Sequence, residues 1–270
     1  MIEKAKGRLV IIGGAEDKQG DCIVLRRLVD ISGKYDSKII IVTAATEYPN
    51  ELGKKYANIF KSIGAKHVET IDILHRKDAN DIKNIDRIKD ASCVFFTGGD
   101  QLRITSIIGG TLIQDELQIL YEKGVVIAGT SAGASVMSET MIVSGNNDDS
   151  PRKCTLKMSP GLGLLKGVVI DQHFAQRGRI GRLLTAIAQN PSMLGIGIDE
   201  DTAIVVMPDA SFEVVGSNAV TIVDATKMDH TNVSELKPDE ILALTNITIH
   251  VLPNGYKFDI NKRQPVMRRY

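Results

Sequence analysis

The stretch KGVVIAGTSAGASVMS, Lys123 to Ser138, indicates how the chain folds and where its chemistry lies. Val125 to Ala128 is an apolar run with the composition of a buried strand. The chain then turns through Gly129-Thr130-Ser131-Ala132-Gly133 and continues into small, apolar residues that can form a helix. A serine between two glycines, where a strand becomes a helix, is the nucleophile-elbow pattern. The stretch predicts a catalytic serine at Ser131, with a glycine-rich turn that only holds a phosphate as the alternative.

The spacing of this motif has a physical reason. A tight turn from strand to helix holds its central residue in strained backbone geometry, and the flanking residues must be small so that neighbouring backbone can approach. The helix that follows points its free N–H groups and its positive dipole end at the serine, where an oxyanion would develop.

Strand-like and helix-like segments alternate through the first two thirds of the chain. The expected strands are 8–12, 38–43, 67–74, 93–96 and 125–128, and the expected helices are 22–29, 49–63, 81–90 and 111–122. A capping box from Thr111 to Gln114 is expected to begin the last helix. This alternation predicts the α/β class, with a doubly wound, mostly parallel sheet flanked by helices. Ligands of such sheets bind beyond the carboxyl ends of the strands, so Gly13-Gly14, Gly98-Gly99 and Ser131 should share one rim.

The last third of the chain is expected to be β-rich. Residues 145–159 are polar and predict a long surface loop, and residues 179–189 predict a helix. Strands are expected at 168–170, 194–198, 202–206, 212–215, 219–223, 241–244, 247–252 and 256–260, with Asn254-Gly255 as a hairpin turn between the last two. Because no break in composition separates the two parts, residues 1–270 are expected to form a single domain.

Composition and charge exclude several classes of partner. The 33 basic and 33 acidic side chains of the 270 residues cancel, so no global field attracts nucleic acid or an anionic membrane. Three cysteines (Cys22, Cys93 and Cys154) lie far apart and are interpreted as free thiols in a reducing cytoplasm. The first residues lack the apolar region of a signal peptide, and no segment is long enough to span a bilayer. A cytoplasmic protein is expected.

A serine nucleophile needs a base, and one histidine is placed to serve. The chain has five histidines: His67, His75, His173, His230 and His250. His173 follows the apolar strand Val168 to Ile170 and should emerge on the same rim as Ser131, whereas the other four suit structural or solvated positions.

The orienting acid is expected at another strand end. Glu200 ends the run GIGIDE, and alternation along an extended chain would point Asp199 and Asp201 to the opposite face. The order Ser131, His173, Glu200 differs from the serine, acid, histidine order of the α/β-hydrolases, which favours another doubly wound sheet. The N–H of Ala132 and the Gly98-Gly99 turn are the candidates for an oxyanion hole.

Three arginines follow the candidate base closely. Arg177, Arg179 and Arg182 lie within six residues, at the start of an expected helix whose dipole disfavours cations. Arginine without lysine indicates planar, bidentate recognition of carboxylates, so the substrate is expected to carry carboxylate groups.

At this point the sequence resembles cyanophycinase, a family of serine peptidases related to the aspartyl dipeptidases. The matching segments are IIGGAEDK (11–18), FTGGDQ (96–101), GTSAGAS (129–135), SPGLGLL (159–165), DQHF (171–174) with the following R-x-R-x-x-R-L, and GIDEDTA (197–203). They cover about 200 residues in the family's order. The aspartyl dipeptidases share the serine elbow but lack the DQHF and triple-arginine run.

The resemblance implies a class I glutamine amidotransferase-like fold and a defined reaction. Cyanophycin is a poly-aspartate chain with arginine attached by isopeptide bonds to its β-carboxylates, and the family releases β-Asp-Arg from its C-terminal end. The family needs no metal or other cofactor and usually acts as a homodimer. The implied roles are Ser131 as nucleophile, His173 as base, Glu200 as its orienter, the Gly99 and Ala132 amides as oxyanion donors, and Gln101, Asp171, Gln172, Arg177, Arg179 and Arg182 as substrate pocket.

Three other functions compete with this one. A peptidase for aspartyl or isoaspartyl dipeptides would use the same triad. A non-catalytic, amidotransferase-like binding protein would carry Ser131 in a cysteine's usual place. A phosphate-binding module would need a lysine on the glycine loop, and residues 129–135 contain none.

Overall fold

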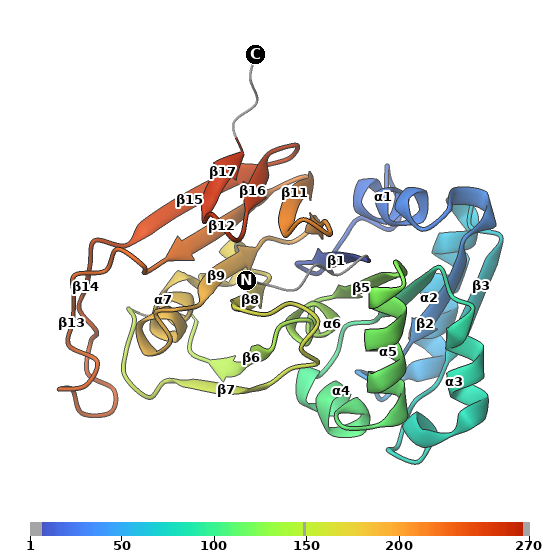
Figure 1. The fold of residues 1–270 in the computed structure, drawn as a ribbon, viewed down its shortest axis with the longest axis horizontal. Coiled ribbons are helices and arrows are strands. Elements are labelled where there is room, and N and C mark those ends of the chain that lie inside the picture. Colours follow the sequence, from blue (N-terminus) through green and yellow to red (C-terminus); the bar gives the residue numbers. More distant parts are fainter. Residues whose placement is uncertain (1–6, 148–149, 267–270) are drawn as a thin grey trace.

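A nine-stranded sheet forms the main layer of the computed structural model, which describes residues 7–147 and 150–266 (Figure 1). In spatial order its strands are β17 (Gln264–Val266), β16 (Lys257–Asp259), β11 (Ser211–Gly216), β10 (Thr202–Val206), β1 (Arg8–Ile12), β5 (Val126–Thr130), β4 (Cys93–Phe96), β2 (Lys38–Val42) and β3 (His67–Ile71). The five strands from β1 to β3 in this order are parallel, as the alternation predicts. From β1 outward to β17 the pairing is antiparallel.

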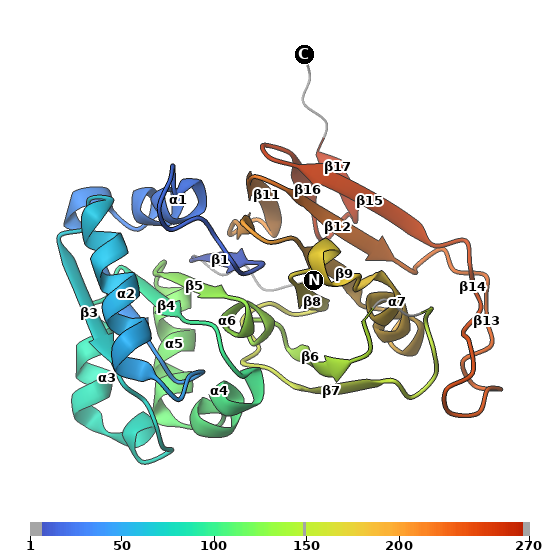
Figure 2. The ribbon, with the colours of Figure 1, turned by 180° about the vertical axis from the view of Figure 1, so that it is seen from behind.

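Helices cover both faces of the parallel half. They are α1 (Ile23–Ile31), α2 (Pro49–Ser62), α3 (Ile82–Lys89), α4 (Gln101–Ile108) and α5 (Leu112–Glu122), with short 3₁₀ turns at Lys34–Asp36 and Asp78–Asn80. Figure 1 views the face that carries α5, and Figure 2 views the face that carries α2. Alternate residues of β1 explain the two layers: Val10 packs in the core beneath α1 and α2, and Leu9 packs in the core beneath α3 to α5.

A second, four-stranded sheet carries the other half of the site. Its order is β15 (Thr248–Pro253), β12 (Ala219–Asp224), β9 (Leu194–Ile198) and β8 (Val168–Gln172), and only β8 and β9 pair in parallel. Leu183 and Ile187 of α7 (Ile180–Gln189) pack with Val169 and Val223 against this sheet. The remaining elements are α6 (Ala132–Ser135), a 3₁₀ turn (Ala175–Arg177), and the two-stranded pairs β6 (Thr140–Gly145) with β7 (Leu156–Pro160) and β13 (His230–Thr231) with β14 (Leu244–Thr245).

One predicted loop and one predicted turn differ from the structure. The expected loop at 145–159 is shorter in the structure: residues 146–155 connect β6 and β7, whereas Gly145 and residues 156–159 pair in the two strands. This pairing, rather than apolar alternation, orders the two ends. Residues 148 and 149 of that prediction lie outside the described part. The Asn254-Gly255 turn does not make a hairpin, because β15 pairs with β12 while β16 pairs with β11 and β17. This turn instead carries the chain from one sheet to the other.

Two helix starts and one strand also differ from expectation. Thr111 begins α5 without a capping box: its hydroxyl donates to Ile108 O at 2.6 Å, and Gln114 Oε1 accepts from the Gly110 N–H at 2.6 Å. Helix α4 was not predicted; Asp100 caps it by accepting the Leu102 N–H at 2.8 Å. Of the expected strand at 241–244, only Leu244 belongs to a strand, β14.

Candidate active site

Ser131 occupies the turn between β5 and α6. Its backbone has φ 53° and ψ −111°, a region that side chains other than glycine rarely adopt. The Ser131 N–H donates to Ile12 O at 3.0 Å, which ties the turn to β1. The flanking glycines are required by contact: a Cβ on Gly129 would lie 2.3 Å from Gly133 O, and one on Gly133 would lie 2.5 Å from Phe96 O. This is the strained, closely packed elbow that the sequence predicts.

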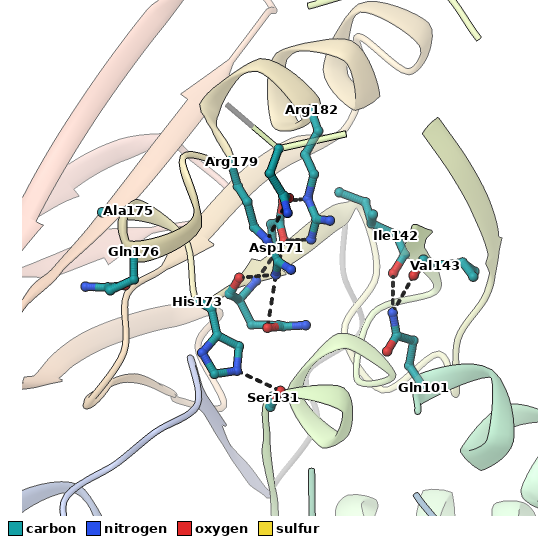
Figure 3. Close-up of polar contacts among 12 residues, drawn as sticks. Gln101, Ser131, Ile142, Val143, Asp171, His173, Ala175, Gln176, Arg179 and Arg182 are labelled. Atoms are coloured by element: carbon teal, nitrogen blue, oxygen red, sulfur yellow. Dashed lines mark hydrogen bonds and ion pairs between the residues drawn. The ribbon is translucent and has the colours of Figure 1, made fainter. Parts of the chain in front are cut away.

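Ser131, His173 and Glu200 form a continuous chain of polar contacts. Ser131 Oγ lies 3.0 Å from His173 Nε2 (Figure 3), and His173 Nδ1 lies 2.6 Å from Glu200 Oε1. The serine comes from the nine-stranded sheet, whereas His173 follows β8 and Glu200 follows β9 of the second sheet. The site is therefore assembled where the carboxyl ends of strands from two sheets meet.

The environment of His173 favours the neutral form of its imidazole. Burial lowers the pKa of His173 below its ordinary value of 6.5, and the nearby Arg177 and Arg179 charges lower it further, while the hydrogen bond to Glu200 opposes them. A neutral imidazole with Nδ1–H directed at a carboxylate presents a free lone pair at Nε2 to the serine hydroxyl. The geometry and the pKa shift both suit a general base.

Backbone carbonyls of the loop after β1 bind the segments that carry the histidine and the acid. Gly13 O accepts the His173 N–H at 2.8 Å, and Gly14 O accepts the Asp201 N–H at 2.9 Å. Gly14 has φ 99°, and a Cβ there would lie 2.4 Å from two atoms of the His173 ring. The Gly13-Gly14 pair thus lies directly against the base, on the rim where strand topology places it.

Asp199 and Asp201 serve the surrounding loops. Asp199 accepts the Ala175 and Ala219 N–H groups at 3.0 and 3.2 Å. Asp201 Oδ1 accepts the Asp17 N–H at 2.8 Å, and Oδ2 accepts the Ser217 hydroxyl. Their carboxylates are engaged away from His173, which leaves Glu200 as its partner.

The Gly98-Gly99 turn and Ala132 surround the serine. Gly98 faces Ser131, since a Cβ on Gly98 would lie 3.4 Å from Ser131 Cβ. Gly99 has φ 145° and packs so closely on Ala45 that a Cβ would lie 2.1 Å from Ala45 O. Ala132 is the first residue of α6, where no helical carbonyl accepts its N–H. These positions are compatible with the expected oxyanion donors.

Four of the six expected pocket residues form one buried cluster beside His173. Asp171 is fully buried, and both its oxygens accept from the Arg182 guanidinium, with Nε to Oδ2 at 2.6 Å. Arg179 Nη1 lies 3.4 Å from Asp171 Oδ1 and 3.1 Å from Gln172 Oε1 (Figure 3). Burial lowers the pKa of Arg179 to about 10, against the stabilising charge of Asp171. Arg182 therefore binds a carboxylate of the protein itself, that of Asp171, rather than being free for a carboxylate of a substrate.

The other two expected pocket residues lie apart from this cluster. Arg177 is exposed in the 3₁₀ turn after His173. Gln101, in the first turn of α4, donates from Nε2 to Ile142 O at 3.2 Å and to Val143 O at 2.7 Å (Figure 3). It thereby fastens strand β6 beside the site.

The sequence pattern missed two residues that contact this site. Gln176 Oε1 accepts the Glu200 N–H at 2.9 Å, and Asn147 Oδ1 accepts Arg179 Nε at 3.3 Å. Neither belongs to an apolar period or a glycine turn, so no local signal distinguishes them. Asn147 shows that the tip of the β6–β7 hairpin reaches the arginine cluster.

Neither a metal cluster nor a membrane span is found in the described part of the chain. Among residues 7–147 and 150–266, no three histidine, cysteine, aspartate or glutamate side chains are grouped so that they could hold a metal ion. No helix within these ranges is both long and apolar enough to cross a bilayer.

Comparison with known proteins connects this site to a family. The model of peptidase family S51 matches residues 9–215. A cyanophycinase of Geminocystis herdmanii is 36% identical over 267 residues, 98% of each chain. A cyanophycinase of Trichormus variabilis is 38% identical over 262 residues, 97% of this chain and 88% of that protein.

Solved structures support the same fold. A peptidase from an acI-B1 actinobacterium superposes with a TM-score of 0.63 over 91% of this chain and 97% of its own, at 21% identity. The resemblance found in the motifs is confirmed over nearly the whole length of the chain. The chain belongs to peptidase family S51.

Proposed function

We propose that this protein is a serine exopeptidase that hydrolyses the poly-aspartate backbone of cyanophycin and releases β-Asp-Arg. The observation that carries the proposal is the contact chain from Ser131 Oγ through His173 to Glu200, at 3.0 and 2.6 Å. The substrate class rests on relatives named cyanophycinase that are 36 and 38% identical over nearly the full chain.

In the proposed mechanism, Ser131 Oγ attacks the scissile carbonyl carbon while His173 Nε2 takes its proton. Glu200 orients the imidazole and stabilises the imidazolium that forms. The Gly99 and Ala132 amides donate to the oxyanion. The imidazolium returns the proton to the departing amine, and the acyl-enzyme forms. A water molecule, activated by His173, then cleaves the ester and restores the Ser131 hydroxyl.

Substrate recognition is proposed to divide among the arginines. Arg177 is exposed and can bind an aspartyl carboxylate. Arg179 donates from Nε to Asn147 and from Nη1 to Asp171 and Gln172, so it would bind a carboxylate through Nη2. Asp171 holds Arg179 and Arg182 in position. Gln101 and Gln172 complete the proposed pocket.

The same proposal includes the more specific expectations for the fold, the location and the assembly of the protein. They are the class I glutamine amidotransferase-like fold with a β-rich C-terminal part, a cytoplasmic protein that needs no cofactor, and a homodimer. Light scattering tests the last: the proposed dimer has twice the mass of one chain, and a monomer at working concentration contradicts it.

Incubation with insoluble cyanophycin tests the proposed reaction. Wild type is expected to release β-Asp-Arg, read by mass spectrometry, and Ser131→Ala is expected to release none. If wild type cleaves only short aspartyl peptides, the protein is a dipeptidase. If a fluorophosphonate probe does not label Ser131 and no peptide is cleaved, the site is a binding site. A Ser131→Ala protein as active as wild type would contradict the assignment of the nucleophile.

A further inference from the structure

Glu16 is a buried carboxylate that the triad does not use. It lies in the loop after β1 and is 3% exposed. Its Oε1 accepts the Tyr56 hydroxyl at 2.5 Å and lies 3.2 Å from Lys18 Nζ, and its Oε2 accepts the Thr130 hydroxyl at 2.6 Å. A buried carboxylate is costly unless it is paired, and a fully paired one is held in a single geometry. Both oxygens of Glu16 are paired, so its carboxylate is held in a single geometry.

The groups around Glu16 come from separate elements. Tyr56 belongs to α2 and is 4% exposed, and Thr130 ends β5 and is 2% exposed. Burial and the Glu16 charge raise the pKa of Tyr56 well above its usual value, so its hydroxyl remains a donor. The Lys18 ammonium lies 5.5 Å from the centre of the Tyr56 ring and closes the cluster. Glu16 thus joins α2, the β1 loop and the end of β5.

Thr130 directly precedes the strained residue. A backbone with φ 53° and ψ −111° persists only where its surroundings over-determine it. The Ser131 N–H donates to Ile12 O, and the hydroxyl of the preceding residue, Thr130, donates to Glu16. Since Gly13 O and Gly14 O bind the His173 and Asp201 amides, one loop contacts the segments of both nucleophile and base.

We propose that Glu16 is a positioning residue: through the Thr130 hydroxyl it sets the backbone that presents Ser131 Oγ to His173 Nε2. The inference deepens the proposed function and rests on Ser131 being the nucleophile. Glu16 acts through Thr130 rather than on the reacting atoms.

Two variants disturb the contact from its two sides. Glu16→Gln removes the charge and leaves one acceptor oxygen for the two hydroxyls of Tyr56 and Thr130. Thr130→Val removes the hydroxyl at nearly constant shape. The rate of Ser131 labelling by a fluorophosphonate and kcat for β-Asp-Arg release are expected to fall about 10- to 100-fold, because small misplacements of a reacting group cost rates of this order. KM should stay within about twofold, since substrate contacts are unchanged. Thr130→Ser keeps the hydroxyl, so its labelling rate and kcat should stay near those of wild type.

The double variant and a remote control separate positioning from stability. Glu16→Gln with Thr130→Val should be about as slow as the slower single variant, because both substitutions act on the same contact. Asp224→Asn is the matched control: Asp224 is 5% exposed and accepts the Thr226 hydroxyl at 2.9 Å and Arg263 Nη1 at 2.7 Å. It pairs with Leu194 at the far end of β9 from Glu200. This variant should lose stability but label at the wild-type rate per folded molecule.

The outcomes distinguish this inference from the proposed function. Folded Glu16→Gln and Thr130→Val proteins that label at the wild-type rate would overturn the positioning role, and so would a rise in KM at constant kcat. Insolubility of either variant leaves the other to test the same contact. If wild type labels at Ser131 but spares cyanophycin, the substrate assignment fails and the labelling comparison still decides the role of Glu16. If wild type does not label at all, both proposals fall.

Discussion

His173 lies between a hydroxyl and a carboxylate, and the Arg177 charge acts on it from the adjoining turn. Because a nearby cation disfavours the imidazolium, Arg177 contributes to the lowered pKa of His173. In Arg177→Gln that pKa should rise, so the base becomes protonated at a higher pH. The acidic limb of the kcat/KM profile should therefore move to higher pH, with activity lost at mildly acidic pH first. Arg177→Lys keeps the charge and should keep the limb in place; equal midpoints in both variants would contradict the argument.

Gly14 is the residue that packs on the base. In Gly14→Ala the new Cβ would lie 2.4 Å from His173 Nε2, so the ring must shift from the position in which it meets Ser131. We expect kcat to fall by about 100-fold. Gly64→Ala is the control, since Gly64 has a similar φ of 110° but a new Cβ there would meet no atom of residues 7–147 and 150–266 within 4 Å. Both variants carry the backbone strain, and only the first should lose activity; equal losses would show that strain alone is responsible.

Asp171 is paired with two buried guanidinium groups, those of Arg179 and Arg182, and its single charge offsets one of the two positive charges. In Asp171→Asn, Arg179 and Arg182 keep their charges without the carboxylate, and removing one partner of a buried ion pair costs about 3–5 kcal/mol. The free energy of unfolding, from urea titration, should fall by this amount. Arg182→Lys keeps the charge but loses the two-pronged contact, and should cost less. A stable Asp171→Asn protein would contradict the structural role given to this carboxylate.

At the scale of elements, the β6–β7 hairpin is held by contacts with α4 and with residues 239–242. Gln101 of α4 donates to the β6 carbonyls of Ile142 and Val143. Beyond the hairpin tip, residues 151–153 pair with 239–242, where Lys153 N donates to Glu240 O and Leu242 N to Pro151 O, both within 3.0 Å. These contacts hold Asn147 where it can meet Arg179.

Gln101→Glu should loosen this hairpin. A carboxylate cannot donate to the two carbonyls, and each hydrogen bond contributes about 1 kcal/mol, so amide exchange in β6 should accelerate by about tenfold or more. Hydrogen exchange read by mass spectrometry measures it. Gln114→Glu is the matched control, because Gln114 Nε2 also donates to a backbone carbonyl, Leu162 O at 3.2 Å, but from α5. It should leave β6 unchanged; equal effects would contradict the tether.

At the scale of the whole molecule, both ends of the described chain enter one sheet and one core. Strand β1 and strands β16 and β17 belong to the nine-stranded sheet, and Leu9 shares a core cluster with Phe258 and Ile260. If residues 1–270 form one domain, as we propose, urea should unfold the protein in one cooperative transition. Circular dichroism and tyrosine fluorescence should then coincide, since the chain has six tyrosines and no tryptophan. Two separate transitions would contradict a single domain.

The local sequence pattern was enough to predict the parallel half of the sheet and to select the three residues that meet at the site. Buried parallel strands are continuous apolar runs, and the strand-end rule brings their carboxyl ends together. Ser131, His173 and Glu200 each follow such a run, so each was expected at a strand end near the others. The structure brings them together from two sheets rather than along the rim of one sheet, which the strand-end rule does not determine. The glycines beside Ser131 carried the signal of a close backbone approach.

Contacts between distant segments had to await the folded chain. Glu16 and Thr130 lie 114 positions apart, and neither period nor turn chemistry links them. Asp171 is a charged residue in a buried strand, and the arginines that pair with it face inward because α7 packs on β9. The route of Asn254-Gly255 between two sheets was equally hidden, because pairing choice depends on which edge is free. The periodicity of the sequence determines which side chains of each segment are buried. The residue that pairs with a buried charge, and the strand that pairs with a sheet edge, depend on how distant segments pack.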